Sequence, residues 1–137
     1  MIKVAATHEI RIDCEDDIIR VRRRVRDIAE LRKFDSFATA AITTAASELA
    51  RNALVHGGAG VARIEEVSDG FRLGLRLVFE DSGPGIADVP RVLAGGYTTA
   101  RSMGLGLSGS RRLVDDFELE SVPGAGTKVT VCKWRRF

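Results

Sequence analysis

The stretch Glu80-Asp81-Ser82-Gly83-Pro84-Gly85-Ile86 directly follows a run rich in Leu, Val and Phe that is typical of a β-strand. An aspartate at the end of a strand can accept a hydrogen bond from an exocyclic amine. The glycines Gly83 and Gly85 behind it would allow a flat ring to approach the backbone. An ordinary turn after an edge strand would use the same residue types. Taken alone, the stretch therefore leaves a ligand site and a plain turn both open.

Three polar residues recur every four positions in the Ala-rich segment that precedes this strand, namely Glu48, Asn52 and His56. On a helix this spacing places them along one ridge, beside an apolar ridge that contains Leu49 and Ala53. A carboxylate and an amide one turn apart can hold a hard cation and a hydroxyl group or water side by side. The alternative is the polar boundary of an ordinary amphipathic helix, and for His56 a capping or boundary contact outweighs catalysis.

Two further glycine-rich stretches lie nearer the C-terminus. Gly104-Leu105-Gly106-Leu107 opens a helix expected from about Leu107 to Asp115, and N–H groups at a helix N-terminus can bind phosphate. The stretch has neither the Lys of a Walker loop nor the preceding strand of a dinucleotide-binding motif. Gly124-Ala125-Gly126-Thr127 is by itself a hairpin turn. Each is weak evidence when taken singly.

The rest of the chain predicts an α+β fold, a two-layer sandwich with helices on one face of a mixed, mostly antiparallel sheet. All 14 glycines lie at or after Gly57, so regular elements dominate the first 56 residues. The residues from Asp81 to Gly106 are expected to form a long binding loop or lid. The first expected elements are a strand at Glu9–Asp13, a helix capped by Asp13 or Asp16 with the buried stripe Ile18, Val21, Val25, Ile28 and Ala29, and a helix opened by Asp35 or Ser36 that runs to His56. Strands at Val61–Val67 and Phe71–Glu80 are expected to form an antiparallel hairpin through the Ser68-Asp69-Gly70 turn, and strands at Phe117–Ser121 and Thr127–Trp134 follow.

Length and composition bound the possible functions. A chain of 137 residues, 45% hydrophobic and 29% charged, predicts a single domain over residues 1–137. The net charge of +2 disfavours a protein that coats nucleic acid. The sequence contains neither a membrane span nor a signal peptide, and Cys14 and Cys132 are expected to be free thiols in a cytoplasmic protein. The arginines of the first helix are either a solvated face or a docking surface for an acidic partner.

Taken together and in this order, the four motifs resemble those of the ATP-binding superfamily of gyrase, Hsp90, histidine kinases and MutL (GHKL, or Bergerat, fold). In that superfamily Glu-x-x-x-Asn is the N box, and three glycine boxes follow it. Within the superfamily, the length of the chain and the lack of room for a phosphorylated-histidine hairpin favour the stand-alone serine/threonine protein kinases of bacterial partner-switching systems. Ser47-Glu48-Leu49-Ala50-Arg51-Asn52, Gly96-Tyr97-Thr98-Thr99, the segment 109–117 and Lys133-Trp134 resemble the RsbT-like branch.

The resemblance implies a role for each motif. Asp81 would bind the adenine amine with support from Thr127, and Gly83 and Gly85 would belong to the same nucleotide site. Asn52 would ligate Mg²⁺, and Gly104, Gly106 and Leu107 would present backbone N–H groups to the phosphates of ATP. Glu48 would be the general base, the single catalytic residue. Arg101 in the expected lid is more simply a solvated side chain than a phosphate ligand.

The resemblance also implies partners. A kinase of this branch phosphorylates a STAS-domain antagonist and, once released, activates a PP2C-type phosphatase in a stress pathway that controls a sigma factor; a stressosome scaffold is a further possible partner. Two alternatives stay open: an anti-sigma-factor kinase of the RsbW or SpoIIAB type, and a non-catalytic switch module. Intact Glu48 and Asn52 argue against the module, because a degenerate site needs neither residue.

Overall fold

The computed structural model describes residues 1–85 and 101–136, and for residues 101–106 only the backbone is described. The elements follow the order β1 (Lys3–Ile12), α1 (Glu15–Leu31), α2 (Ser36–Val55), β2 (Gly60–Ser68), β3 (Leu73–Asp81), α4 (Arg101–Leu113), β4 (Asp116–Val122) and β5 (Gly126–Trp134). This is the predicted α+β architecture. The Gly96-Tyr97-Thr98-Thr99 motif lies outside the described residues.

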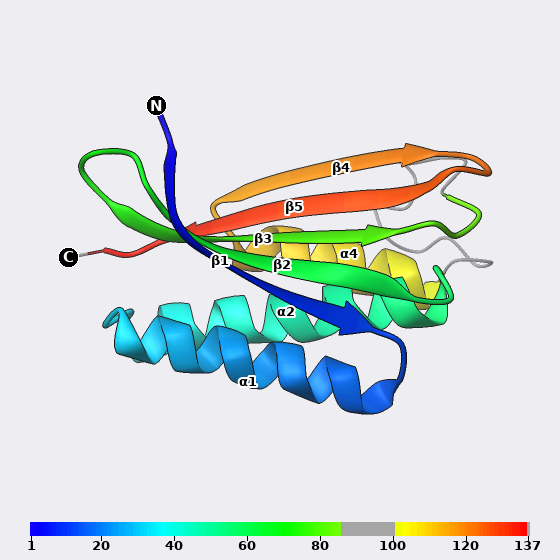
Figure 1. Ribbon diagram of the computed structural model, residues 1–137, viewed down its shortest axis with the longest axis horizontal. Helices are drawn as coiled ribbons and strands as arrows, with labels where there is room; N and C mark the ends of the chain where they lie inside the picture. Colours follow the sequence, from blue (N-terminus) through cyan, green and yellow to red (C-terminus); the bar gives the residue numbers. More distant parts are fainter. Residues whose placement is uncertain (86–100, 137) are drawn as a thin grey trace.

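The five strands form one sheet in the order β1-β2-β3-β5-β4, and every pairing among the described strands is antiparallel (Figure 1). The expected mixed sheet is thus an antiparallel one over the described part. The predicted β2–β3 hairpin is confirmed, with Ser68 opposite Leu73 at its turn. At the other end of β3, Asp81 is the register partner of both Gly60 and Thr127, so the end of the strand is flanked on both sides.

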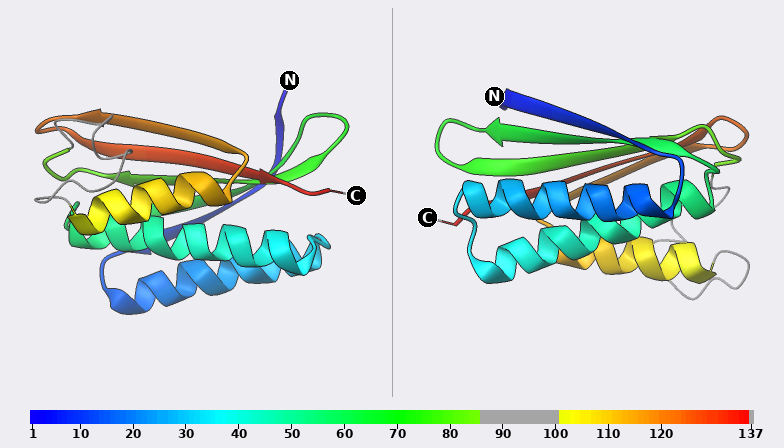
Figure 2. Two further views of the ribbon diagram at one scale, coloured as in Figure 1. Left: turned by 180° about the vertical axis from the view of Figure 1, so that it is seen from behind. Right: turned by 60° about the horizontal axis from the view of Figure 1, so that its bottom comes forward.

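The three helices of the described part cover one face of the sheet, as predicted, with α2 between α1 and α4 (Figure 2). The predicted stripe of α1 is confirmed, since Ile18, Val21, Val25, Ile28 and Ala29 are all buried. The small side chains of α2, such as Ala46 and Ala50, allow it to pack closely against both neighbouring helices and the sheet. Among the described residues, none of the helices has the length and apolar character needed to cross a membrane.

Most strand ends differ from the predictions by one or two residues, and three element boundaries differ in ways that have a physical reason. β1 extends back to Lys3 because Val4 to Thr7 pair with β2 across a bulge, although this stretch lacks apolar–polar alternation. Cys14 rather than Asp13 or Asp16 is the N-cap of α1, and its N–H donates to Asp17 Oδ2 at 3.2 Å. Asp35 caps α2 as predicted and accepts a hydrogen bond from the Ala38 N–H.

The third boundary is the start of α4, which begins at Arg101 rather than near Leu107. Gly104 and Gly106 therefore lie within the helix, so Gly106 falls in its second turn rather than at an exposed N-terminus. The Arg, Met and Leu residues between 101 and 107 are strong helix formers and outweigh the cost of about 1 kcal/mol for each glycine. Of the predicted lid, residues 86–100 lie outside the described part, and those that follow are helical.

Candidate nucleotide site

Four elements converge on a small cavity at the end of the sheet where β3 terminates. Its volume is about 20 Å³, enough for roughly one water molecule. Four of the predicted site residues line it, each from a different element: Asn52 from α2, Asp81 from β3, Leu107 from α4 and Thr127 from β5. Its other walls are apolar and are formed by Leu49, Ala53, Phe79 and Val129. Residues up to 80 positions apart in the sequence, Leu49 and Val129, are thus brought together around one cavity.

Asp81 is partly buried and its carboxylate is held by backbone donors. Its Oδ1 accepts a hydrogen bond from the Gly83 N–H at 2.9 Å. Burial raises the pKa of Asp81 above its ordinary value, and the N–H groups of Gly83 and Thr127 and the nearby His56 oppose that effect. The carboxylate is therefore oriented by the protein and poorly solvated, as an acceptor for a ligand donor should be.

Glycines surround Asp81 closely, and the sequence prediction missed this. A Cβ atom on Gly57 would collide with the Asp81 side chain, and one on Gly83 would lie 2.6 Å from the Gly57 Cα. On Gly126, which has a φ of +111°, a Cβ would meet the carbonyl oxygen of Asp81. Because these positions exclude side chains, the backbone closes tightly around the carboxylate and fixes its direction.

The loop after Asp81 packs on the turn between β4 and β5. The Gly124 N–H donates to the Pro84 carbonyl at 2.6 Å, and Gly85 has a φ of +77° with Val122 directly behind it. At the start of β5, the Thr127 and Ser121 hydroxyls lie 3.0 Å apart and share a hydrogen bond. Two of the predicted glycine boxes therefore touch, although 40 residues separate them.

The polar ridge of α2 leads from solvent into this cavity. Glu48 is exposed, whereas Asn52 lies one turn further along and is partly buried at the cavity wall. Asn52 Nδ2 and His56 Nε2 are buried without a hydrogen-bond partner in the part of the chain that the structure describes. An amide in this position has hydrogen-bonding capacity that a ligand would complete.

His56 is the C-cap of α2, immediately before Gly57. Burial lowers the pKa of His56 below its ordinary value of 6.5, and the Asp81 carboxylate opposes this to a smaller extent. The interpretation of His56 as a helix-end boundary contact fits this position. The histidine also lies close enough to Asp81 for the two charges to interact.

The lowered pKa of His56 predicts a pH effect on stability. The unfolded chain binds this proton more tightly than the folded chain, so stability rises with pH up to about 6.5 and is lost as His56 is protonated. We expect the Tm to fall between about pH 7.5 and about pH 5.5, where carboxylates stay ionised, and to fall less in His56→Asn. His8→Asn is the control and should keep the part of the pH dependence of the Tm that comes from His56. An equal dependence of the Tm on pH in wild type and His56→Asn would contradict the lowered pKa of His56.

Gly104 and Gly106 precede Leu107 on α4, and Leu107 is buried in the cavity wall. Of the predicted second glycine box, Leu107 is thus the residue that lines the cavity, on a helix with α2 as its neighbour. Glu48 does not line the cavity; it is exposed on α2, next to the wall residue Leu49.

The fold and the site together define the class of ATPases that includes gyrase and Hsp90. The family model of histidine kinase-, DNA gyrase B-, and HSP90-like ATPases matches residues 37–136. A solved histidine kinase domain from Erythrobacter litoralis shares the fold, with a TM-score of 0.54 at 22% identity over 86% of this chain and 59% of that one.

Sequence similarity narrows the class. The chain is 43% identical over 127 residues to the serine/threonine-protein kinase RsbT of Bacillus subtilis, covering 93% of this chain and 96% of the relative. It is 31% identical to an anti-sigma F factor of a Thermoanaerobacter species, covering 68% of each chain. The chain therefore belongs to the GHKL ATPase family and, within it, to the RsbT-type serine/threonine protein kinases.

A solved structure with the RsbU and RsbW domains of a Mycobacterium tuberculosis protein also has this fold. Its TM-score is 0.68 at 21% identity, over 97% of this chain and 34% of that one. The predictions of superfamily, fold class and kinase activity are thus confirmed. The role of each site residue stays a prediction.

Proposed function

We propose that this kinase transfers the γ-phosphoryl group of ATP to a serine or threonine of a STAS-domain antagonist in a bacterial partner-switching pathway. The observation that carries the proposal is the convergence of Asn52, Asp81, Leu107 and Thr127, from four motifs and four elements, on one cavity. The similarity to a protein named as a serine/threonine kinase RsbT supports the reaction class.

The cavity has the chemistry of an adenine site but not yet its size. Asp81 offers a desolvated acceptor for the exocyclic amine, and Thr127 with its partner Ser121 supplies hydroxyls beside it. Phe79 and Val129 provide apolar walls for a flat ring. Since the cavity holds only about one water molecule, binding of a purine requires the cavity walls to separate. Leu107 on α4 is the wall residue that links the cavity to the proposed phosphate region.

Asn52 suits a magnesium ion that is bound mainly through phosphates. Its amide is half-buried at the cavity. The amide oxygen would be the ligand to Mg²⁺, and the nitrogen, which has no partner within the described residues, would donate to a phosphate oxygen of the nucleotide. Mg²⁺ in such sites takes one or two protein oxygens and the phosphates. When bound, the ion would neutralise charge that develops on the phosphoryl oxygens.

In this proposal Glu48 acts on the phosphoacceptor rather than on the nucleotide. It lies one helical turn from Asn52 and is exposed, so a hydroxyl group of a docked protein can reach its carboxylate. Accepting the hydroxyl proton is the role of a general base in phosphoryl transfer.

The regulatory part of the proposal is that the kinase, when its antagonist is phosphorylated and released, binds and activates a PP2C-type phosphatase. Support comes from similarity to RsbT and from the fold shared with a protein that contains RsbU and RsbW domains. Similarity to anti-sigma F factors supports the alternative, in which the kinase binds a sigma factor directly.

One experiment tests the reaction and separates the alternatives. The protein is incubated with γ-labelled ATP, Mg²⁺ and each STAS-domain protein of the same genome, and binding to the phosphatase and sigma factor is measured in parallel. The proposal expects label on a serine or threonine of one STAS protein and binding to a phosphatase. Label with sigma-factor binding would favour the anti-sigma alternative, and the absence of label with every STAS protein would favour a non-catalytic module.

The glycines of α4 give a further prediction. Because Gly106 lies inside the helix, Gly106→Ala should not lower the Tm. Alanine stabilises a helix interior by about 0.5–1 kcal/mol relative to glycine, so the Tm should stay the same or rise. ATP affinity should nevertheless fall, since the resemblance places Gly106 against the phosphates, where an added Cβ would intrude. Gly109→Ala is the matched control on the same helix, because its added Cβ meets open space. Thermal unfolding gives the Tm and calorimetric titration gives the affinity for ATP. If Gly106→Ala lowers the stability of the fold as much as it lowers the affinity, the role of Gly106 is structural.

A further inference from the structure

A second candidate surface lies at the end of the sheet opposite the nucleotide cavity. We define this hairpin end as residues 31–34, 68–74 and 134–136, which are the α1–α2 turn, the β2–β3 turn and the end of β5. Figure 1 shows the three segments at one end of the molecule, with the C-terminus among them. Strand β3 runs from Leu73 here to Asp81 at the cavity, a span of roughly 26 Å at strand rise.

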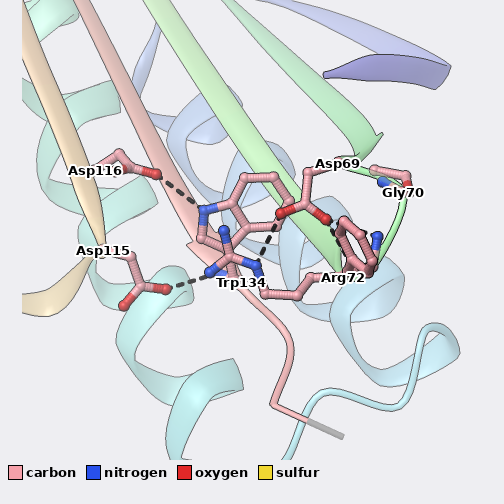
Figure 3. A network of polar contacts seen from close by, with 8 residues as sticks. Asp69, Gly70, Arg72, Asp115, Asp116 and Trp134 are labelled. Atoms are coloured by element: carbon pink, nitrogen blue, oxygen red, sulfur yellow. Dashed lines mark hydrogen bonds and ion pairs between the residues drawn. The ribbon is translucent and has the colours of Figure 1, made fainter. Parts of the chain in front are cut away.

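The β2–β3 turn at this end is held rigid by polar contacts (Figure 3). Asp69 Oδ1 accepts hydrogen bonds from the Phe71 N–H at 2.9 Å and the Arg72 N–H at 2.7 Å, and Oδ2 accepts one from Arg72 Nε at 3.0 Å. These contacts lower the pKa of Asp69 to about 2, so the network is complete at neutral pH.

The network continues into the sheet. The Arg72 guanidinium lies over the Trp134 ring at 4.3 Å from its centroid, and Trp134 Nε1 donates to Asp116 Oδ2 at 2.9 Å (Figure 3). Gly74 makes room for the indole, because a Cβ there would lie 2.7 Å from it. The turn is therefore anchored at both its backbone and its arginine.

This rigid turn displays an apolar side chain to solvent. Phe71 is 97% exposed, and Leu73 beside it and Leu31 on the α1–α2 turn are also exposed. Between Leu73 and the α1–α2 turn lies a cavity of about 260 Å³ whose walls include Phe34 and Val67. A preorganised turn with an exposed aromatic ring loses little conformational freedom on binding, which is the property of an interface anchor.

The charge around this apolar group is basic on balance. The hairpin end contains five basic residues and one acidic residue, Asp69, which is paired with Arg72. Three acidic residues adjoin it: Glu66 is mostly buried and pairs with His8 and Arg32, Asp115 lies 4.0 Å from Arg136, and Asp116 accepts from Trp134. The excess of positive charge therefore lies on Lys33 and Arg135. Arg135 donates from its side chain to the Arg32 carbonyl at 2.9 Å, which draws the chain end against the α1–α2 turn. The basic residues are Arg32, Lys33, Arg72, Arg135 and Arg136.

We propose that the hairpin end is a docking surface for a protein with an apolar pocket for Phe71 and an acidic rim around it. The phosphoacceptor must reach Asn52 and Asp81, at the far end of β3, so its acceptor residue does not sit here. This inference rests on the proposed function, and within it the occupant is the PP2C-type phosphatase. Nucleotide and phosphatase then occupy opposite ends of one sheet, and neither blocks the other.

The test compares two surface variants with matched controls by calorimetric titration against the phosphatase and by phosphorylation of the STAS antagonist. Phe71→Ser removes the anchor, and Ile19→Ser on α1 is its control at another exposed apolar position. The double variant Arg135→Glu with Arg136→Glu reverses the basic rim, and Arg111→Glu with Arg112→Glu on α4 is its control. Each hairpin-end variant should lose tenfold or more in phosphatase affinity, as anchor residues do, with the Tm and STAS phosphorylation unchanged.

The outcomes separate the inference from the function on which it rests. Phosphatase binding by wild type and equal binding by both hairpin-end variants would overturn the docking surface and leave the proposed function standing. Loss of STAS phosphorylation in the same variants would also overturn it, because the surface would then serve the phosphoacceptor. If wild type bound no phosphatase, the regulatory part of the proposed function would fail and the docking surface with it.

Discussion

Asp81→Asn should strongly weaken ATP binding while the protein stays folded. Asp81 Oδ1 already accepts the Gly83 N–H, so the oxygen of an asparagine can keep that bond while its NH₂ group replaces the other carboxylate oxygen. The adenine amine would then face a donor in place of an acceptor. A buried hydrogen bond lost in this way costs about 1–3 kcal/mol, a roughly tenfold to hundredfold weaker affinity.

The same substitution should cost little stability, because burial already disfavours the ionised form of Asp81. Glu80→Gln is the matched control: it removes a neighbouring carboxylate, which pairs with Arg63 across the sheet, and should leave ATP binding intact. Calorimetric titration with ATP gives the affinity, and thermal unfolding gives the stability. An unchanged affinity in Asp81→Asn would remove the adenine assignment.

The regular elements of the fold were predictable because their signals are local. Residues close together in the sequence are enough to predict the buried stripe of α1, the Asp35 cap of α2 and the hairpin with its Asp69-Gly70 turn. The start of β1 was not predictable, since Val4 to Thr7 are ordered as a strand by pairing with β2, about 60 residues further along. The start of α4 was missed because Gly104 and Gly106 signalled a loop, whereas the Arg, Met and Leu residues around them favour a helix.

The candidate site shows the same division. The order of Asn52, Asp81 and Thr127 along the chain was enough to place them in one site by resemblance, and the cavity brings them together. The close packing of Gly57 and Gly126 on Asp81 depends on sheet register and on where α2 ends, which no local pattern encodes. The Ser121–Thr127 hydroxyl pair has the same origin, because it joins two strands across a turn.

Glu48→Gln should separate phosphoryl transfer from nucleotide binding. Glutamine keeps the shape of the side chain and removes its basicity, so transfer to the STAS antagonist should fall by on the order of 10²-fold or more. Binding of Mg-ATP should persist, because Glu48 is exposed and is not a wall of the cavity. Glu30→Gln, at another exposed helical glutamate, is the control for loss of charge.

Asn52→Ala should behave differently, although Asn52 lies only one turn from Glu48. It removes a proposed magnesium ligand at the cavity wall, so Mg²⁺-dependent nucleotide binding should weaken together with transfer. Binding of ATP without Mg²⁺ should change less, which distinguishes a lost ligand from a damaged pocket.

The decisive measurement is phosphoserine or phosphothreonine on the antagonist by mass spectrometry. Equal phosphorylation by wild type and Glu48→Gln would exclude Glu48 as the general base, because another group would then accept the proton of the attacking hydroxyl.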